Sequence, residues 1–323
     1  MQRWGRLPVH PRPFGYGAGC TPPRPFLSGV RQAAIYFFAL LAGSSLGAQE
    51  YTYQTFKDSR VVNIQSVETL AKRRLDVRIG HRFGDMFGDN GGWPTFYGLE
   101  NATDVMIGAE YGFTDNFTAG VYRTKGAGAM PQGQAGLRQL VNGVFKYRLI
   151  RQKEGEGAPI TLTVLGVGSV STSQRIEGNP DVLRSFPDFS HRMAFTGQLL
   201  FGRKFSDGLS LQLAPGYTHR NLVPFEDENG LFSVGAAARV QLSRVFGIIA
   251  DVTVPFSERR TTDNGFYPAI GLGLEIDTGG HLFQVNFTNA TGIMETDYIP
   301  YTTSNWMEGE FRLGFTISRV FNL

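Results

Sequence analysis

Residues able to do acid–base chemistry are few in this sequence. Four of its five histidines, His81, His191, His219 and His281, fall in segments where apolar and polar residues alternate, and all four share the apolar phase. A hydrolase would need one of them hydrogen-bonded to a nucleophile and oriented by a third group. Ser190 beside His191 does not supply this, because neighbours along a strand point to opposite faces. The pattern therefore favours positions at a membrane interface over catalysis.

The sequence has no motif for a cofactor or a metal. The stretches GVGSV at 166–170 and GLGLE at 271–275 lack the spacing of phosphate-binding loops and are typical of strands. The only cysteine, Cys20, lies upstream of the expected mature chain, which excludes disulfides and thiolate chemistry there. A net charge of +3 without basic clusters excludes nucleic acid. We expect no cofactor, no metal and no enzymatic activity.

A larger set of charged residues occupies the opposite phase of the same segments. Basic residues outnumber acidic ones in it, and rings of Arg and Lys in a pore favour anions. If these side chains face a water-filled lumen, they predict passage of small polar or anionic solutes. The alternative is that they form ion pairs inside a closed barrel and make it rigid. The pore-lining candidates are Arg78, Arg82, Asp104, Glu110, Arg138, Lys146, Arg148, Arg192, Arg239, Asp251, Glu275 and Arg312.

The segments that must position these residues follow one pattern from residue 75 to the end of the chain. Each has period-two hydrophobicity over roughly 9 to 15 residues and ends at Gly, Asn, Asp or Pro, as β-strands do. We predict twelve strands, at 75–83, 104–113, 117–125, 137–149, 159–173, 191–205, 209–220, 231–242, 246–256, 267–276, 281–291 and 310–323.

The connections between these strands alternate between long and short. Such alternation is typical of outer-membrane barrels, in which one rim faces the periplasm and the other faces outside. Twelve strands enclose a lumen wider than one layer of side chains can fill. We therefore expect charges around a wet lumen and aromatics against lipid, without a large packed core. The predicted fold is all-β, a transmembrane antiparallel up-and-down β-barrel of outer-membrane type.

The last strand, in GEFRLGFTISRVFNL at 309–323, keeps its pattern to the end because a barrel closes by pairing its last strand with its first. Its apolar positions Phe315, Ile317, Phe321 and Leu323, interrupted by Arg319, resemble the C-terminal signal recognised by barrel-assembly machinery. We expect that machinery and outer-membrane lipid as partners.

An export signal precedes the barrel. RQAAIYFFALLAGSSLGAQE at 31–50 has a basic start, an apolar stretch and a small-residue end, which predicts a signal peptide over 30–48 cut after Ala48. Residues 1–29 are then a misassigned upstream extension, with Val30 as the initiator. Residues 49–74 are either a periplasmic tail or, through VVNIQSVETL at 61–70, a segment in the lumen; the barrel is 75–323.

The last long loop carries acidic and aromatic residues. Folded inward, it would pair with lumenal arginines and narrow or plug the pore; left outside, it is an ordinary surface loop. The residues that would form the plug are Glu295, Asp297, Tyr298, Tyr301 and Trp306.

Four stretches resemble one known family. They are RIGHRFGD at 78–85, YGLENATDVMIGAEYGFTDN at 97–116, YTHRNLVPF at 217–225 and GLGLEIDTGGHLFQVNFTNATGIMETDYIPYTTSNW at 271–306. They are similar to the outer-membrane β-barrels of bacteroidetes known as domain of unknown function 5777. The resemblance implies location and fold, and it transfers no catalytic residue.

The sequence thus predicts an outer-membrane protein that acts as a passive channel for small polar or anionic solutes. Two alternatives stay open. One is a closed barrel with a structural or surface-loop binding role, and the other is a lipid-modifying hydrolase using His191 or His219.

Overall fold

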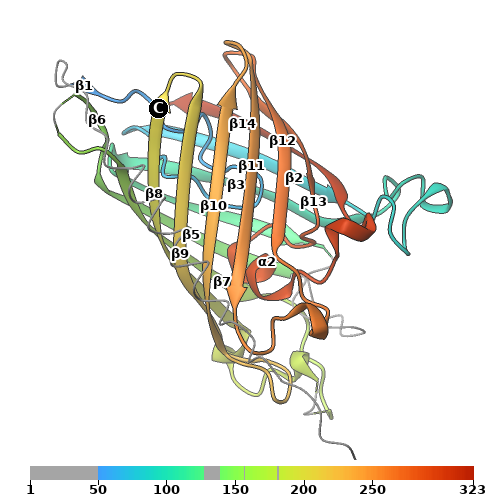
Figure 1. Ribbon diagram of the computed structural model, residues 1–323. Helices are drawn as coiled ribbons and strands as arrows, with labels where there is room; N and C mark the ends of the chain where they lie inside the picture. The colour runs from blue at the N-terminus through green and yellow to red at the C-terminus, as the bar shows by residue number, and fades with distance from the viewer. Residues whose placement is uncertain (1–49, 127–138, 156, 180–181) are drawn as a thin grey trace, which may run out of the picture. The chain divides into compact units, whose positions relative to one another are not determined.

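The computed structural model describes residues 50–126, 139–155, 157–179 and 182–323. Twelve antiparallel strands form one closed barrel in which each strand pairs with its neighbours along the chain (Figure 1), so the predicted fold class is confirmed. The strands are β2 (Arg74–Phe83), β3 (Ala102–Thr114), β4 (Phe117–Lys125), β5 (Gln139–Ile150), β7 (Thr161–Ser171), β8 (Met193–Ser206), β9 (Leu209–Arg220), β10 (Gly230–Gln241), β11 (Phe246–Phe256), β12 (Ala269–Asp277), β13 (Leu282–Thr288) and β14 (Arg312–Asn322).

The remaining elements are short. A two-residue pair, β1 (Glu50–Tyr51) with β6 (Lys153–Glu154), lies outside the barrel sheet. Within the described residues, no helix has the length and apolar character needed to cross a membrane. The helices are η1 (Trp93–Thr95), η2 (Leu183–Ser185), η3 (Phe189–Arg192), η4 (Thr262–Asn264), α2 (Glu295–Tyr301) and η5 (Trp306–Glu308).

The barrel closes between β14 and β2. Their pairing runs from Gly314 opposite Arg82 to Asn322 opposite Arg74, and the Leu323 N–H donates to the Arg73 carbonyl at 2.9 Å. The last residue is therefore held by a backbone hydrogen bond, which explains why the alternation of apolar residues continues to the end of the chain.

The strand faces are inverted relative to a water-soluble barrel. Outward side chains are apolar and exposed, as at Ile107 (54% exposed) and Val121, whereas inward positions hold buried polar and charged groups such as Lys146 and Asp251. Tight links at one end of the barrel (the short-turn rim) and longer loops at the other (the long-loop rim) accompany this inversion. Both features are those of a barrel whose outer wall contacts lipid.

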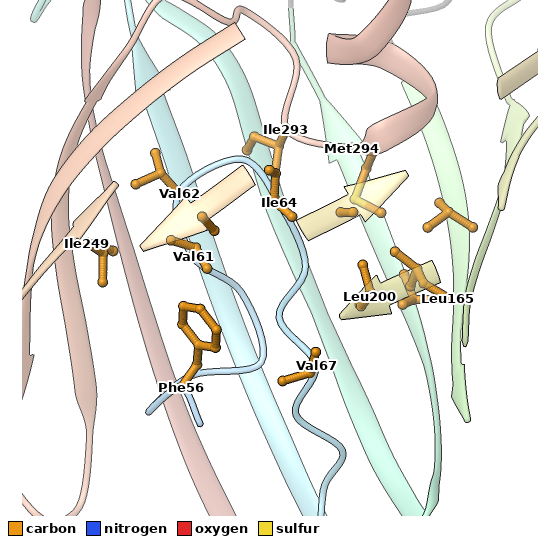
Figure 2. Packing of buried hydrophobic residues seen from close by; sticks show 14 of the residues in the cluster. Phe56, Val61, Val62, Ile64, Val67, Leu165, Leu200, Ile249, Ile293 and Met294 are labelled. Carbon is orange, nitrogen blue, oxygen red and sulfur yellow. The ribbon is translucent and has the colours of Figure 1, made fainter. Parts of the chain in front are cut away.

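The lumen contains a packed core, and the expectation of a wet lumen without one is wrong. Residues 52–70, which we call the N-terminal plug, contact inward side chains of strands all around the barrel. Figure 2 shows Val61, Val62, Ile64 and Val67 of the plug in one apolar cluster with Ile249, Leu165 and Leu200 of the wall. A twelve-stranded barrel leaves more interior space than its own side chains fill, and the plug fills part of it.

Three inward-facing glycines make room for the plug. A Cβ atom added at Gly202 would lie 2.8 Å from Val67, one at Gly235 would lie 2.8 Å from Ile64, and one at Gly271 would lie 2.6 Å from Val62. These glycines come from β8, β10 and β12. The wall is thus shaped to the apolar side of the plug.

We expect the plug to contribute to stability through this packing. Ile64 is 0% exposed, so Ile64→Ala should lower the free energy of unfolding in urea by about 2–5 kcal/mol, since it removes buried methyl groups and leaves a cavity. Ile107→Ala, on the outward face, is the matched control and should cost less. Equal losses for the two variants would contradict the plug's role in the core.

Candidate functional site

The functional candidates lie on the inner wall of the barrel. Arg138 falls outside the described residues, and Arg192 is half-buried in η3, where its guanidinium donates to the Ser173 carbonyl at 2.7 Å. The other pore-lining candidates are buried within the barrel: Arg78, Arg82, Asp104, Glu110, Lys146, Arg148, Arg239, Asp251, Glu275 and Arg312. Most of them contact a segment that occupies the lumen instead of facing open water.

Asp251 holds the tip of the N-terminal plug. Its Oδ2 accepts hydrogen bonds from the backbone N–H groups of Val62 at 2.8 Å, Asn63 at 2.6 Å and Ile64 at 3.2 Å. Its Oδ1 accepts from Asn63 Nδ2 at 2.7 Å. One wall carboxylate thus satisfies three consecutive backbone donors that the irregular plug leaves unpaired.

Basic wall residues hold the rest of the plug. Arg78 forms an ion pair with Asp58 of the plug and a second one with Asp76 of its own strand at 2.9 Å. Lys146 Nζ donates to the Ser59 carbonyl at 2.6 Å. These contacts compensate groups that would be costly to bury alone.

A second segment enters the lumen from the long-loop rim. Residues 289–302, which we call the loop plug, include α2 (Figure 1), and every residue of α2 is buried. Asp104 Oδ2 accepts from the Ile293 N–H at 3.0 Å, and the hydroxyls of Ser169 and Thr296 are 2.6 Å apart. The loop-plug candidates Glu295, Asp297, Tyr298 and Tyr301 lie here.

Trp306, the remaining loop-plug candidate, lies apart from that group. It belongs to η5, and its ring stacks on Phe311 with the ring centroids 4.9 Å apart. Phe311 precedes β14 in the phase of outward residues such as Leu313. Trp306 therefore packs toward the outer wall of the barrel.

Two arginines join the two plugs, and we call this contact the latch. Arg60 of the N-terminal plug donates to the Ile293 carbonyl and to Glu295 Oε1 at 3.1 Å. Arg82 of the wall donates to Asn63 Oδ1 at 2.7 Å and also to the Gly292 carbonyl. Segments from opposite rims thus meet at two buried guanidinium groups.

The latch leaves almost no free space. The cavity lined by Arg60, Arg82, Met106 and Ile293 has a volume of about 10 Å³, which is room for about one water. Burial raises the pKa of Glu295, and the charge of Arg60 opposes that rise. The space beside these two guanidinium groups is therefore too small for a solute larger than water.

The barrel interior opens again at the short-turn rim. Two cavities of about 620 Å³ and 340 Å³ flank the base of the plug and share Tyr53, Glu68 and Arg74 in their linings. They form a vestibule that ends at the plug.

The four histidines that the structure describes contact aromatic rings, a backbone N–H group and an arginine. His81 stacks on Phe315 with centroids 5.6 Å apart, and His191 Nδ1 accepts from the Asp188 N–H. His219 lies beside Tyr217, and His281 lies 3.4 Å from Arg319. Among the residues that the structure describes, no group of three or more His, Cys, Asp or Glu side chains could hold a metal ion.

Sequence reasoning missed the residues that dock the N-terminal plug. Asp58, Arg60 and Asn63 lie in a stretch without periodicity, so no pattern distinguished them from a polar tail. The sequence feature that indicates the plug lies in the strands of the barrel wall, where Gly202, Gly235 and Gly271 occupy inward-facing positions. Glycines in place of side chains at such positions indicate a backbone or side chain packed closely against them.

A family of membrane-bound barrels matches most of the chain. The sequence model of a family described as membrane bound beta barrel domain (DUF5777) matches residues 56–321. No curated protein matches the chain at a significant level.

Similar solved structures include the NanC porin, with 9% identity, a TM-score of 0.45 and coverage of 77% of this chain and 99% of the porin. The KdgM porin has 8% identity, a TM-score of 0.43 and coverage of 77% and 99%. An outer membrane channel from Pseudomonas putida F1 has 11% identity, a TM-score of 0.45 and coverage of 79% and 98%.

We expect Asp251 to be the main polar anchor of the N-terminal plug. Asp251→Ala leaves buried N–H donors without a partner at a cost of about 1–3 kcal/mol. The undocked fraction should therefore rise by about tenfold, seen as faster tryptic cleavage after Lys57 and Arg60.

The matched control is Asp277→Ala, which removes the partly exposed ion pair between Asp277 and Lys57 of the same plug, 2.8 Å apart. Such pairs contribute about 0–1 kcal/mol, so cleavage should change little. If the two variants are cleaved at the same rate, Asp251 is not the anchor.

Proposed function

The chain belongs to the family of membrane-bound β-barrel domains (DUF5777), and from this membership we propose that it is an outer-membrane channel closed by two plugs. In this proposal the open state passes small polar or anionic solutes. The outward apolar wall supports a membrane location. Export through a signal peptide at 30–48 and delivery by barrel-assembly machinery belong to the same proposal.

The observation that carries the proposal is the nature of the contacts between plugs and wall. Lys146, Arg82 and Arg312 donate to backbone carbonyls of residues 59, 292 and 289, which lie in the plugs. When the plugs leave, these cations lose those partners and face water. By contrast, Arg239 stays paired with Glu275 at 2.8 Å and Arg78 with Asp76. Departure of the plugs also frees the carboxylates of Asp104 and Asp251. Three cations and two anions of the wall thus lose partners, and this excess of cations favours anions.

Closure in the described state follows from the latch. The cavity of about 10 Å³ beside Arg60 and Arg82 admits about one water, whereas the vestibule at the short-turn rim is far larger. Solute passage thus requires displacement of at least one plug. The resting protein should conduct rarely.

A permanently closed barrel with a structural or surface-loop role is the second candidate. The apolar cluster between plug and wall supports it, because Ile64, Val67 and Leu200 are fully buried together. Such packing resists displacement of the plug. A hydrolase draws no support from the histidines, since within the described part of the chain His191 pairs with the Asp188 N–H and His219 lies beside Tyr217.

Conductance in a planar bilayer separates the two candidates. Gly271→Val places a side chain where Val62 lies, because even a Cβ there would be 2.6 Å from Val62. The channel proposal predicts a roughly tenfold or greater rise in open time, since a displacement cost of about 1.4 kcal/mol is enough for that change.

The matched control is Gly197→Val, whose added Cβ meets nothing within 4 Å. It should behave like the unmodified protein. A folded Gly271→Val protein that never conducts, although trypsin cleaves its plug, would support the permanently closed barrel.

Ion selectivity tests the wall charges. In the Gly271→Val background, replacing Arg82 and Arg312 by Gln should lower the anion-to-cation permeability ratio by roughly twofold or more, since the lumen loses two cations. The ratio is read from the reversal potential in a salt gradient. Arg319→Gln, on the outward phase of β14, serves as control, and an equal effect there would exclude the lumenal assignment.

A further inference from the structure

The loop between β2 and β3, residues 84–101, carries a group of exposed aromatic rings at the long-loop rim. Trp93 is 72% exposed, Phe87 55% and Phe96 50%. We call this segment the aromatic loop; Figure 1 shows it extending beyond the ends of β2 and β3. An exposed apolar group of this kind marks an interaction surface.

The aromatic loop is held in one conformation by backbone hydrogen bonds. The Met86 N–H donates to the Phe311 carbonyl at 2.9 Å and the Phe87 N–H to the Gly309 carbonyl at 3.2 Å. The base of the loop is therefore hydrogen-bonded to the residues that immediately precede β14. Phe96 and Tyr97 both have positive φ angles, 46° and 55°. Bulky residues rarely adopt this conformation. The rings are thus displayed by a defined loop.

The rings continue an aromatic path that begins on the outer wall. Phe287 of β13 lies in the outward phase, and its ring centroid is 6.1 Å from that of Phe311. Phe311 lies 5.7 Å from Phe87, which lies 5.5 Å from Tyr97. Tyr97 then contacts Trp93 at 6.4 Å. The lipid-facing surface of the barrel therefore extends without interruption onto the loop.

One acidic group of the aromatic loop, Asp85, is hydrogen-bonded within the loop. Asp85 accepts hydrogen bonds from the N–H groups of Gly88 at 3.1 Å and Asn90 at 3.3 Å, so its charge is used inside the loop. The rings of Phe87, Trp93 and Phe96 are exposed, with the indole N–H and the Tyr97 hydroxyl as polar atoms beside them, and the loop also exposes Asp89 and Glu100. Tryptophan and tyrosine combine an apolar ring with a polar N–H or O–H group, and such side chains favour the membrane interface.

We propose that the aromatic loop is a lipid-binding anchor whose Trp93 and Phe96 side chains lie among the headgroups and upper acyl chains of the bilayer leaflet at the long-loop rim. The inference depends on the membrane location of the barrel and not on channel activity. Lipid is the partner because the loop surface is continuous with the wall that already contacts it. The anchor fixes the depth of β2, β3 and β14 in the bilayer.

Tryptophan fluorescence provides the test. The chain has three tryptophans, and only Trp93 and Trp306 lie downstream of the expected signal peptide. Trp306→Phe in the mature protein leaves Trp93 as the single reporter in reconstituted phosphatidylcholine vesicles. We expect phospholipids brominated near the headgroup to quench its emission more than those brominated deep in the acyl chains, and iodide in the water to quench it weakly.

A matched control uses Phe225, which is 95% exposed on the loop between β9 and β10. Phe225→Trp in a protein lacking Trp93 and Trp306 should be quenched by iodide and not by bromolipid. Strong iodide quenching of Trp93 would place the loop in water and overturn the proposal. Shielding of Trp93 from both quenchers would indicate a second copy or another protein, and equal bromolipid quenching at both positions would indicate nonspecific contact; either result also overturns it.

Discussion

The structure depends on one geometric constraint, which is that a closed barrel of twelve strands encloses more space than its inward side chains can fill. Those inward positions hold Arg, Lys, Asp and Glu, which are costly to bury unless they are hydrated or paired. Water in the lumen could hydrate these groups, or another segment of the chain could fill the lumen and pair with them. Here the chain supplies two segments, and their carbonyls, N–H groups and carboxylates pair with the wall. The same charges that would make a pore polar therefore dock the plugs that close it.

The two plugs are coupled because they share donors and acceptors. Arg60 contacts both its own segment, through the Asn63 carbonyl, and the loop plug, through Glu295. Arg82 contacts Asn63 and Gly292 in the same way. Movement of the loop plug alone would leave two buried guanidinium groups partly unpaired, which weakens the hold on the N-terminal plug. A displacement that starts at either rim would thus act on the same latch.

The barrel could be predicted from the sequence because a strand with lipid on one face and a lumen on the other repeats every two residues. That periodicity identified twelve strands within a few residues of their ends and placed Lys146 and Asp251 on the inner face. The interior of the lumen could not be predicted in this way. The N-terminal plug is irregular, so Asp58 and Asn63 have no period, and their partners are wall residues distant in sequence. The loop plug was suspected from composition, yet Trp306 has the same composition signal and packs outward.

Whether the plugs move depends on the balance between two kinds of contact. The polar contacts exchange readily for water, because a guanidinium or ammonium group released from a carbonyl regains hydration, and the net free energy of such exchanges is small. The apolar contacts of Ile64, Val67 and Val62 do not exchange in this way, since their release exposes hydrocarbon to water. The barrier to opening therefore lies mainly in a few aliphatic side chains packed over glycines. In the proposed channel, the latch closes the lumen, the aliphatic contacts hold the plug in place, and the polar contacts exchange for water on opening.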